Sequence, residues 1–166
     1  LDDATLSNIL VDGITDDDYG YNTGIDINLK DGSYENITIE DSVVSNITKG
    51  TPSDDAASTA VAIKARDDGG YGGKYAATLD DVTIDNLSVT DSFNGLRIGE
   101  FDTDYSGSGE PTAPTNVSVI NSQFRNNSGY HIKDVANATD LNTVRANNNN
   151  KFDQIVTSNL GLYSSI

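Results

Sequence analysis

Short runs of alternating apolar and polar residues recur along the chain. Residues 82–84, 87–89 and 96–98 each place a polar side chain between two apolar ones. Alternation with a period of two is typical of β-strands that bury one face. Because each run is too short to bury a face by itself, the pattern predicts strands that stack on equivalent strands from other parts of the chain.

The order of these runs repeats. Its copies cover residues 8–27, 36–64, 81–98, 116–133 and 141–156. Stacking the copies as successive turns buries a continuous core, as in a solenoid. The content of Asp, Asn, Gly and β-branched residues disfavours helices throughout. We therefore predict an all-β fold, a parallel β-helix of about five turns with three short strands each. It forms a single domain over residues 1–166, as part of a larger secreted protein.

Asn and Asp recur at the bend between the first two runs of a turn, at Asp41, Asn86 and Asn121. Both residue types tolerate the left-handed backbone conformation that a sharp bend requires. We expect their side chains to hydrogen-bond along the axis of the solenoid. A bend Asn followed by a strand with Ser or Thr also creates glycosylation sequons without any need for a glycan. The sequons lie at Asn36, Asn46, Asn86, Asn116, Asn126 and Asn137.

This repeat resembles the right-handed parallel β-helix of the pectate lyase, polygalacturonase and mannuronan C5-epimerase superfamily, in which an Asn ladder occupies a comparable bend. Residues 94–98, Asn-Gly-Leu-Arg-Ile, are similar to a substrate-contacting segment of polygalacturonases, in which a Lys stands where this chain has Gly99. The resemblance implies a right-handed solenoid that binds or processes a uronate-type polysaccharide. The Asp-Pro-His-type motif of the epimerases and the double-Asp strand of the polygalacturonases are absent from this sequence.

The composition of the chain limits the environment in which the protein works and the partners that it can bind. The chain has no Cys, which excludes a disulfide framework and Cys-based metal sites, and its formal net charge is −16. An acidic surface disfavours nucleic acid, because phosphates require a basic partner. No apolar run is long enough to span a bilayer. We therefore predict an extracellular, bacterial protein that binds neither nucleic acid nor membrane.

The long insertions of the chain all flank strands of a single column. Ile25, Val61, Leu96 and Tyr130 mark the column and are predicted to point inward. Function in rigid scaffolds concentrates on the loops beside such strands. In the family that the repeat resembles, the comparable column is the floor of the polysaccharide cleft. We therefore place the candidate site on the outward face of this column.

Strand alternation predicts the outward side chains of the column. They are Asp26 and Asn28, Ala62 and Lys64, Arg97 and Gly99, and His131 and Lys133. With a neighbouring loop residue, the basic members form a predicted substrate-binding patch of Lys64, Arg66, Arg97, His131 and Lys133. Such a patch in an acidic protein suits an acidic polysaccharide, because Arg binds carboxylates through two parallel hydrogen bonds.

The same residues allow three interpretations, which the sequence leaves open. In lyase or epimerase chemistry, Arg97 would neutralise the uronate and His131 or Lys64 would remove the C5 proton. Glycoside hydrolysis requires two carboxylates, of which Asp26 supplies one and a loop acid such as Asp67 the other. In the third interpretation these residues are solvated charges without a catalytic role, with Asp26 paired to Lys64.

Acidic loops are candidates for binding calcium, which takes six to eight oxygen ligands. The candidate ligands are Asp16, Asp17, Asp18, Asp67, Asp68, Asp102 and Asp104. None of these loops matches an EF-hand, and no motif predicts an organic cofactor.

The ends of a solenoid raise a separate expectation, because a bare end turn exposes strand edges that can pair with another chain. No capping sequence is evident at Leu1, and residues 158–166 are predicted to form a tail that folds over one end or side. Two functional classes follow. One is a polysaccharide-binding or polysaccharide-processing module, and the other is a structural or adhesive module that forms homodimers through its ends.

Overall fold

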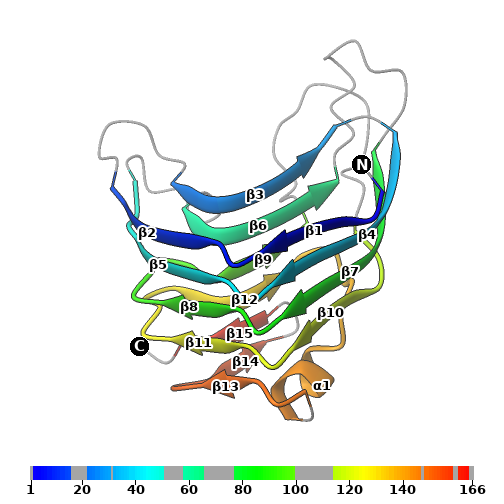
Figure 1. Ribbon diagram of the computed structural model, residues 1–166. Helices are drawn as coiled ribbons and strands as arrows, with labels where there is room; N and C mark the ends of the chain where they lie inside the picture. Colours follow the sequence, from blue (N-terminus) through cyan, green and yellow to red (C-terminus); the bar gives the residue numbers. More distant parts are fainter. Residues whose placement is uncertain are drawn as a thin grey trace, which may run out of the picture.

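The computed structural model describes residues 2–15, 22–30, 32–50, 58–65, 77–99, 114–146, 148–158 and 161–164. These residues form a stack of strands that winds around one apolar interior (Figure 1). Three sheets, here named A, B and C, run along the stack, and a full turn contributes one strand to each. The predicted all-β parallel β-helix of about five three-strand turns is confirmed.

Neighbouring strands within a sheet come from successive turns. Sheet A contains β1 (Ala4–Ser7), β4 (Ser33–Glu40), β7 (Thr78–Asp85) and β10 (Val117–Ile120). Sheet B contains β2 (Leu10–Ile14), β5 (Val43–Ile47), β8 (Ser88–Thr90), β11 (Gln123–Arg125) and β13 (Lys151–Phe152). Sheet C contains β3 (Thr23–Leu29), β6 (Thr59–Ala65), β9 (Leu96–Ile98), β12 (Tyr130–Asp134), β15 (Gly161–Tyr163) and β14 (Val156–Ser158).

Equivalent side chains of successive turns stack inside the three sheets. Ile39 of β4 pairs with Ile84 of β7, which pairs with Val119 of β10, and all three are completely buried. Burial of apolar surface stabilises a fold by roughly 25 cal/mol per Å². The stacked core therefore holds together strands that are too short to be stable alone.

Asn and Asp form the corners of the turns. All thirteen non-glycine residues with positive φ in the described ranges are Asn or Asp, including the predicted bends at Asp41, Asn86 and Asn121. The Asn86 amide donates to Asp41 at 2.7 Å, and the Asn121 amide donates to Asp85 at 2.7 Å. The predicted left-handed bends and axial hydrogen bonds are confirmed. All six sequon asparagines have positive φ as well, so corner geometry accounts for each of them.

The fourth turn is offset in sheet C from its predicted alignment. Leu96 of β9 pairs with Ile132 of β12, and Arg97 pairs with Lys133, whereas the sequence pattern placed Tyr130 beside Leu96. The pairing of β12 with β15 also shifts between Tyr130 and Ile132. The repeat alignment thus missed an offset of two residues in this turn.

His131 occupies the inward place that Gly95 has in the preceding turn. A Cβ built on Gly95 would overlap the His131 carbonyl oxygen and contact the ring of Phe124 in the core. His131 itself has no exposed surface, and Tyr130 does not belong to the hydrophobic core cluster. The predictions of an outward His131 and an inward Tyr130 are therefore wrong.

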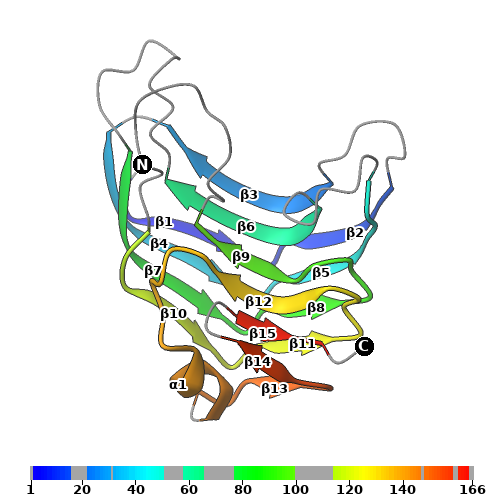
Figure 2. The ribbon, with the colours of Figure 1, turned by 180° about the vertical axis from the view of Figure 1, so that it is seen from behind.

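At the C-terminal end of the stack the chain departs from the three-strand repeat (Figure 2). α1 (Leu141–Ala146) packs beside β10, and β15 pairs antiparallel with both β12 and β14. The expectation that helices are disfavoured throughout is wrong for α1, because Asp140 caps its N-terminus and Val144 is buried in the core. Of the predicted tail, the described residues Gly161–Tyr163 form β15, which extends sheet C as a further strand instead of folding over it.

The first turn is less covered than the second. The interior residues Leu6, Val11, Ile14 and Ile27 are only partly buried. Their register partners in β4, β5 and β6 are Ile39, Val44, Ile47 and Ile63, and each has no exposed surface. The described ranges thus present an apolar end at β1, β2 and β3.

Candidate functional site

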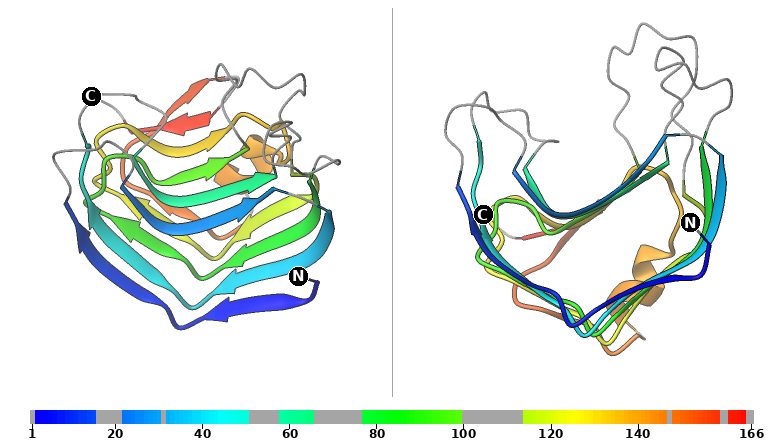
Figure 3. Two further views of the ribbon diagram at one scale, coloured as in Figure 1. Left: turned by 90° about the horizontal axis from the view of Figure 1, so that it is seen from above. Right: turned by 45° about the horizontal axis from the view of Figure 1, so that its top comes forward.

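The candidate site lies on the outer face of sheet C, the side turned away from the core. The right-hand view of Figure 3 shows that sheet C curves so that this face is concave. Asp26, Ala62, Arg97 and Lys133 lie in register across β3, β6, β9 and β12, and we call these four residues the outer row. Because neighbouring strands are about 4.8 Å apart, the outer row places the cations of Arg97 and Lys133 next to each other.

Lys64 follows Ala62 by two residues in β6, and it forms an ion pair with Asp26 of the outer row. Its Nζ is 3.3 Å from Oδ1 of Asp26, and its side chain is 10% exposed against 36% for Asp26. The predicted pairing of Asp26 with Lys64 is confirmed. The outer row itself contains two cations, Arg97 and Lys133, and one carboxylate, Asp26, whose charge is balanced by Lys64.

Tyr130 lies beside the outer row. Its hydroxyl shares a hydrogen bond of 2.8 Å with the Thr59 hydroxyl, and its ring centroid is 5.8 Å from Nζ of Lys133. Burial raises the pKa of Tyr130 to about 12, although the bond to Thr59 and the charge of Arg97 act in the opposite direction. Arg97 is only 5% exposed. The floor of the concave face thus combines a recessed guanidinium with a neutral phenol.

His131 makes its contacts on the core side of β12. Its Nε2 is 2.9 Å from the Gln154 carbonyl oxygen and 3.1 Å from Oδ1 of Asp153, and its ring centroid is 5.8 Å from that of Phe152. Burial lowers the pKa of His131, against the opposing effects of the Gln154 carbonyl and Asp153. The imidazole is therefore neutral at neutral pH.

Asn127 fixes the tautomer of this imidazole. The Ser92 backbone N–H donates to Oδ1 of Asn127 at 3.1 Å, which turns the Asn127 amide nitrogen toward Nδ1 of His131 at 3.2 Å. Nδ1 must accept this hydrogen bond, so the proton lies on Nε2. Because the side chain is fully engaged inside the fold and has no exposed surface, we exclude His131 from the candidate site.

Several predicted site residues lie outside the described ranges. They are Arg66, the loop acid Asp67, and the other calcium candidates Asp16, Asp17, Asp18, Asp68, Asp102 and Asp104. Among the residues that the structure describes, no group of three or more His, Asp or Glu side chains is placed to hold a metal ion. Calcium binding stays a prediction.

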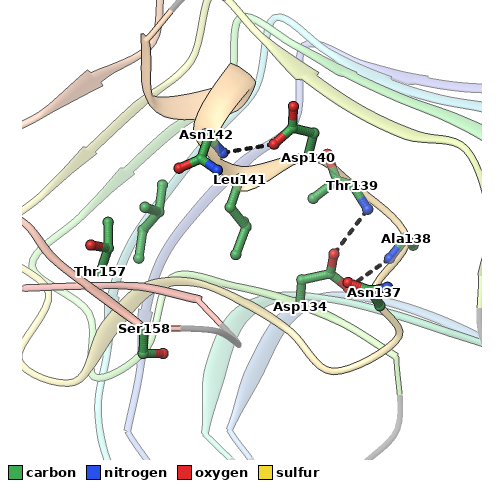
Figure 4. A pocket seen from close by; sticks show the side chains of 10 residues that line it. Asp134, Asn137, Ala138, Thr139, Asp140, Leu141, Asn142, Thr157 and Ser158 are labelled. Atoms are coloured by element: carbon green, nitrogen blue, oxygen red, sulfur yellow. Dashed lines mark hydrogen bonds between the residues drawn. The ribbon is translucent and has the colours of Figure 1, made fainter.

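A second polar cavity, which the sequence did not predict, lies at the C-terminal end of the stack (Figure 4). It is an open groove of about 820 Å³. Its lining consists of Asp134, Asn137, Ala138, Thr139, Asp140, Leu141, Asn142, Thr157, Ser158 and Leu162. The repeat could not reveal it, because it forms where the chain departs from the repeat. The available signal was the cluster of polar residues at 137–142.

No protein-family model, curated protein or solved structure matches this chain. Within the described part of the chain, no helix has the length and apolar character needed to cross a membrane. The fold and the geometry of the two polar surfaces therefore carry the functional interpretation.

Proposed function

We propose that this protein is an extracellular, bacterial β-helix module that binds an acidic, uronate-type polysaccharide along the outer face of sheet C. The observation that carries the proposal is the in-register pairing of Arg97 with Lys133 on a concave sheet face. Two adjacent cations suit a polymer that bears a carboxylate on its sugar units, and a guanidinium binds a carboxylate with two parallel hydrogen bonds. The resemblance of residues 94–98 to a substrate-contacting segment of polygalacturonases supports the same placement, since it includes Arg97.

Binding is the function we infer in preference to polysaccharide processing. His131, the first candidate for proton removal, is buried on the core side of β12. Lys64, the second candidate, forms an ion pair with Asp26. Arg97 and Lys133, the two cations of the outer row, can attract and orient carboxylates without moving a proton.

Calorimetric titration with polygalacturonate and alginate, with dextran as the neutral polymer and with and without calcium, tests the proposal. Loss of the half-buried Lys133 in Lys133→Ala should weaken binding of the acidic polymers about two- to fivefold, as expected for a partly solvated ion pair. Arg97→Lys keeps the charge but loses the planar fork, and should weaken binding by roughly tenfold. The matched control is Lys151→Ala, which removes an exposed cation from β13 in sheet B.

Three results would overturn this assignment. The acidic polymers fail to bind, or dextran binds equally well, or Lys151→Ala weakens binding as much as Lys133→Ala does. Ultraviolet absorbance from unsaturated uronates in the same samples would show lyase activity and refute a purely binding role.

The exposed apolar end favours a second candidate function, a structural module that pairs with a second copy of this chain through β1, β2 and β3. Leu6 and Ile14 are only partly buried at this end, and Leu10 nearby is 73% exposed. At the opposite end α1 packs beside β10 and the last strands of sheet C run antiparallel, so the two ends of the stack differ. Edge strands with free hydrogen-bonding groups and an apolar interior favour such pairing.

Light scattering across a range of protein concentrations tests this second function. We expect a dimer that grows stronger with salt, because two copies of net charge −16 repel each other at low ionic strength. Leu10→Lys should weaken the dimer at unchanged monomer stability. A monomer at every concentration and salt level would refute the candidate and leave the glycan-binding proposal untouched.

A further inference from the structure

We propose that the groove at the C-terminal end of the solenoid is a binding site for an uncharged sugar unit, separate from the outer row. The groove lies between the loop that follows β12, the first turn of α1, and strand β14 (Figure 4). Its volume of about 820 Å³ falls within the range of small-molecule sites. None of its lining residues belongs to the outer row, so the two proposals can fail independently.

Two carboxylates set the sign of the charge in the groove. Asp134 is 3% exposed and accepts hydrogen bonds from the backbone N–H groups of Ala138 at 3.1 Å and Thr139 at 2.9 Å. Asp140 accepts from the Asn142 backbone at 3.0 Å and from the Thr143 hydroxyl at 2.6 Å. The Thr143 hydroxyl and the Asn142 N–H lower the pKa of Asp140, so this carboxylate is charged at neutral pH.

Among the described residues that line the groove, none is a Lys, Arg or His. Two carboxylates with no cation beside them in this described lining repel an anionic ligand, so the uronate that suits the outer row does not suit this groove. The carboxylate oxygens are already engaged with N–H and hydroxyl donors within the chain, which makes them poor candidates for coordinating a metal ion. The remaining chemistry of the lining is that of amides and hydroxyls.

These amides and hydroxyls are available for contact. The side chains of Asn137, Asn142, Thr139 and Thr157 make no hydrogen bond within the part of the chain that the structure describes. Asn137, Asn142 and Thr157 are also exposed. An amide both donates and accepts, as does a hydroxyl, so this set matches the mixed donor and acceptor character of sugar hydroxyl groups.

The apolar part of the lining completes the match. Figure 4 shows Leu141 between the side of the groove that carries Asp134 and the side that carries Thr157 and Ser158. Leu162, which is 1% exposed, also contributes to the lining. A small number of placed polar groups around an apolar surface is the usual construction of a small-molecule site, and a sugar ring presents C–H groups as well as hydroxyls.

Backbone amide chemical shifts, followed by NMR during titration, test the site with defined probes. The neutral probes are D-glucose, D-galactose and D-mannose, and the anionic counterparts are D-glucuronate and D-galacturonate. We expect at least one neutral sugar to shift the amides of residues 134–142 and 157–158, and its anionic counterpart to bind several-fold more weakly. Shifts confined to the outer row, or no shift with any neutral probe, would overturn the proposal.

Three variants separate a binding site from a merely structural region. Asn142→Ala and Thr157→Val each remove one hydrogen-bonding group while keeping residues that suit a helix and a strand, and each should weaken sugar binding about two- to tenfold. Asp140→Asn keeps an effective helix cap but removes a charge, so it should reduce the discrimination against the anionic sugars. Asp2→Asn, an equal charge change at an exposed position in the first turn, is the matched control.

Each outcome of these variants decides the question. Unchanged affinity in Asn142→Ala and Thr157→Val, or equal loss of discrimination in Asp2→Asn and Asp140→Asn, would overturn the site. A titration with calcium chloride completes the test: shifts with calcium but with no sugar would assign the groove to a cation and refute the proposal. If a neutral sugar binds in the groove and Lys133→Ala leaves the binding of the acidic polymers unchanged, the groove is supported and the proposal for the outer row fails.

Discussion

The corner at Asn86 gives a direct test of what holds the turns in place. Asn86 has a φ of 53°, and its side-chain amide donates to Asp41 of the preceding turn at 2.7 Å. Asn86→Ala removes the amide and puts a residue with a poor left-handed propensity at a left-handed position, at a cost of roughly 1–2 kcal/mol. Asn86→Gly removes the same amide but adopts this conformation freely. We therefore expect Ala to be the more destabilising replacement by about 1 kcal/mol, after allowance for the flexibility of Gly in the unfolded chain.

A third replacement isolates the hydrogen bond from the backbone. Asn86→Asp keeps the shape and the left-handed tolerance of the side chain but turns its donor into a carboxylate that faces Asp41. We expect this variant to lose stability at neutral pH and low salt through like-charge repulsion. The loss should shrink in high salt, which screens the repulsion.

Urea unfolding followed by circular dichroism measures all three variants. In a chain of 166 residues a change of 1 kcal/mol corresponds to a shift of about 2–4 °C in Tm, so thermal melts provide a second reading. Ser118→Ala, an exposed position within β10, is the control for a substitution away from a corner. Equal stability of the Ala and Gly variants would refute the role of the left-handed backbone, and a salt-independent Asp variant would refute the axial hydrogen bond.

Three further predictions follow from the interior. Urea unfolding at stepped pH should show stability falling as the pH drops below about 6.5, the unfolded-state pKa of His, because burial lowers the folded-state pKa of His131; His131→Gln should flatten this slope. Gly95→Ala should lose about 1–3 kcal/mol of stability, because its Cβ would overlap the His131 carbonyl oxygen. Tyr130→Phe should cost about 1 kcal/mol by leaving the Thr59 hydroxyl without its partner, and should remove one phenol that titrates near pH 12 in absorbance measurements.

The repeating part of the fold could be predicted from the sequence because each of its features has a local physical cause. Alternation along 82–84 and 117–119 specifies one buried face for each strand, and Ile84 and Val119 do pair inside the stack. Left-handed corners require Asn, Asp or Gly, so the positions of Asn86 and Asn121 mark the bends directly. The alternation of apolar residues and the corner residues can both be recognised within a few consecutive residues of the sequence.

The offset in sheet C could not be predicted in the same way. Tyr130 and Ile132 are both apolar and two residues apart, so alternation alone permits either of them beside Leu96. The choice between the two registers depends on the contact at Gly95. There the His131 backbone approaches so closely that no side chain would fit. This two-residue offset puts Lys133 in the place beside Arg97 that was predicted for His131.

The C-terminal groove escaped prediction for a different reason. Residues 141–156 are predicted to form the fifth copy of the repeat, and within this range Lys151 and Phe152 of β13 do stack in parallel on β11. Asp140 instead caps α1, and the short helix leaves a groove beside β14 where stacked strands would have closed the interior. The repeat pattern predicts only the structure of the repeating turns, so it could not predict a surface that forms where the repeat ends.

The acidic composition and the cationic outer row are compatible because much of the acid has a structural place. Asp12, Asp41 and Asp91 each accept the amide of an Asn from the following turn. Where an Asn amide donates to an Asp of the preceding turn, two carboxylates do not lie directly above each other. The amide of Asn46 and the hydroxyl of Ser45 lower the pKa of Asp12, which shows that such a corner favours the charged form. A net charge of −16 therefore reflects in part how the turns are built, and it does not oppose an acidic polymer at Arg97 and Lys133, because salt screens exposed charges that lie more than about 8–10 Å away.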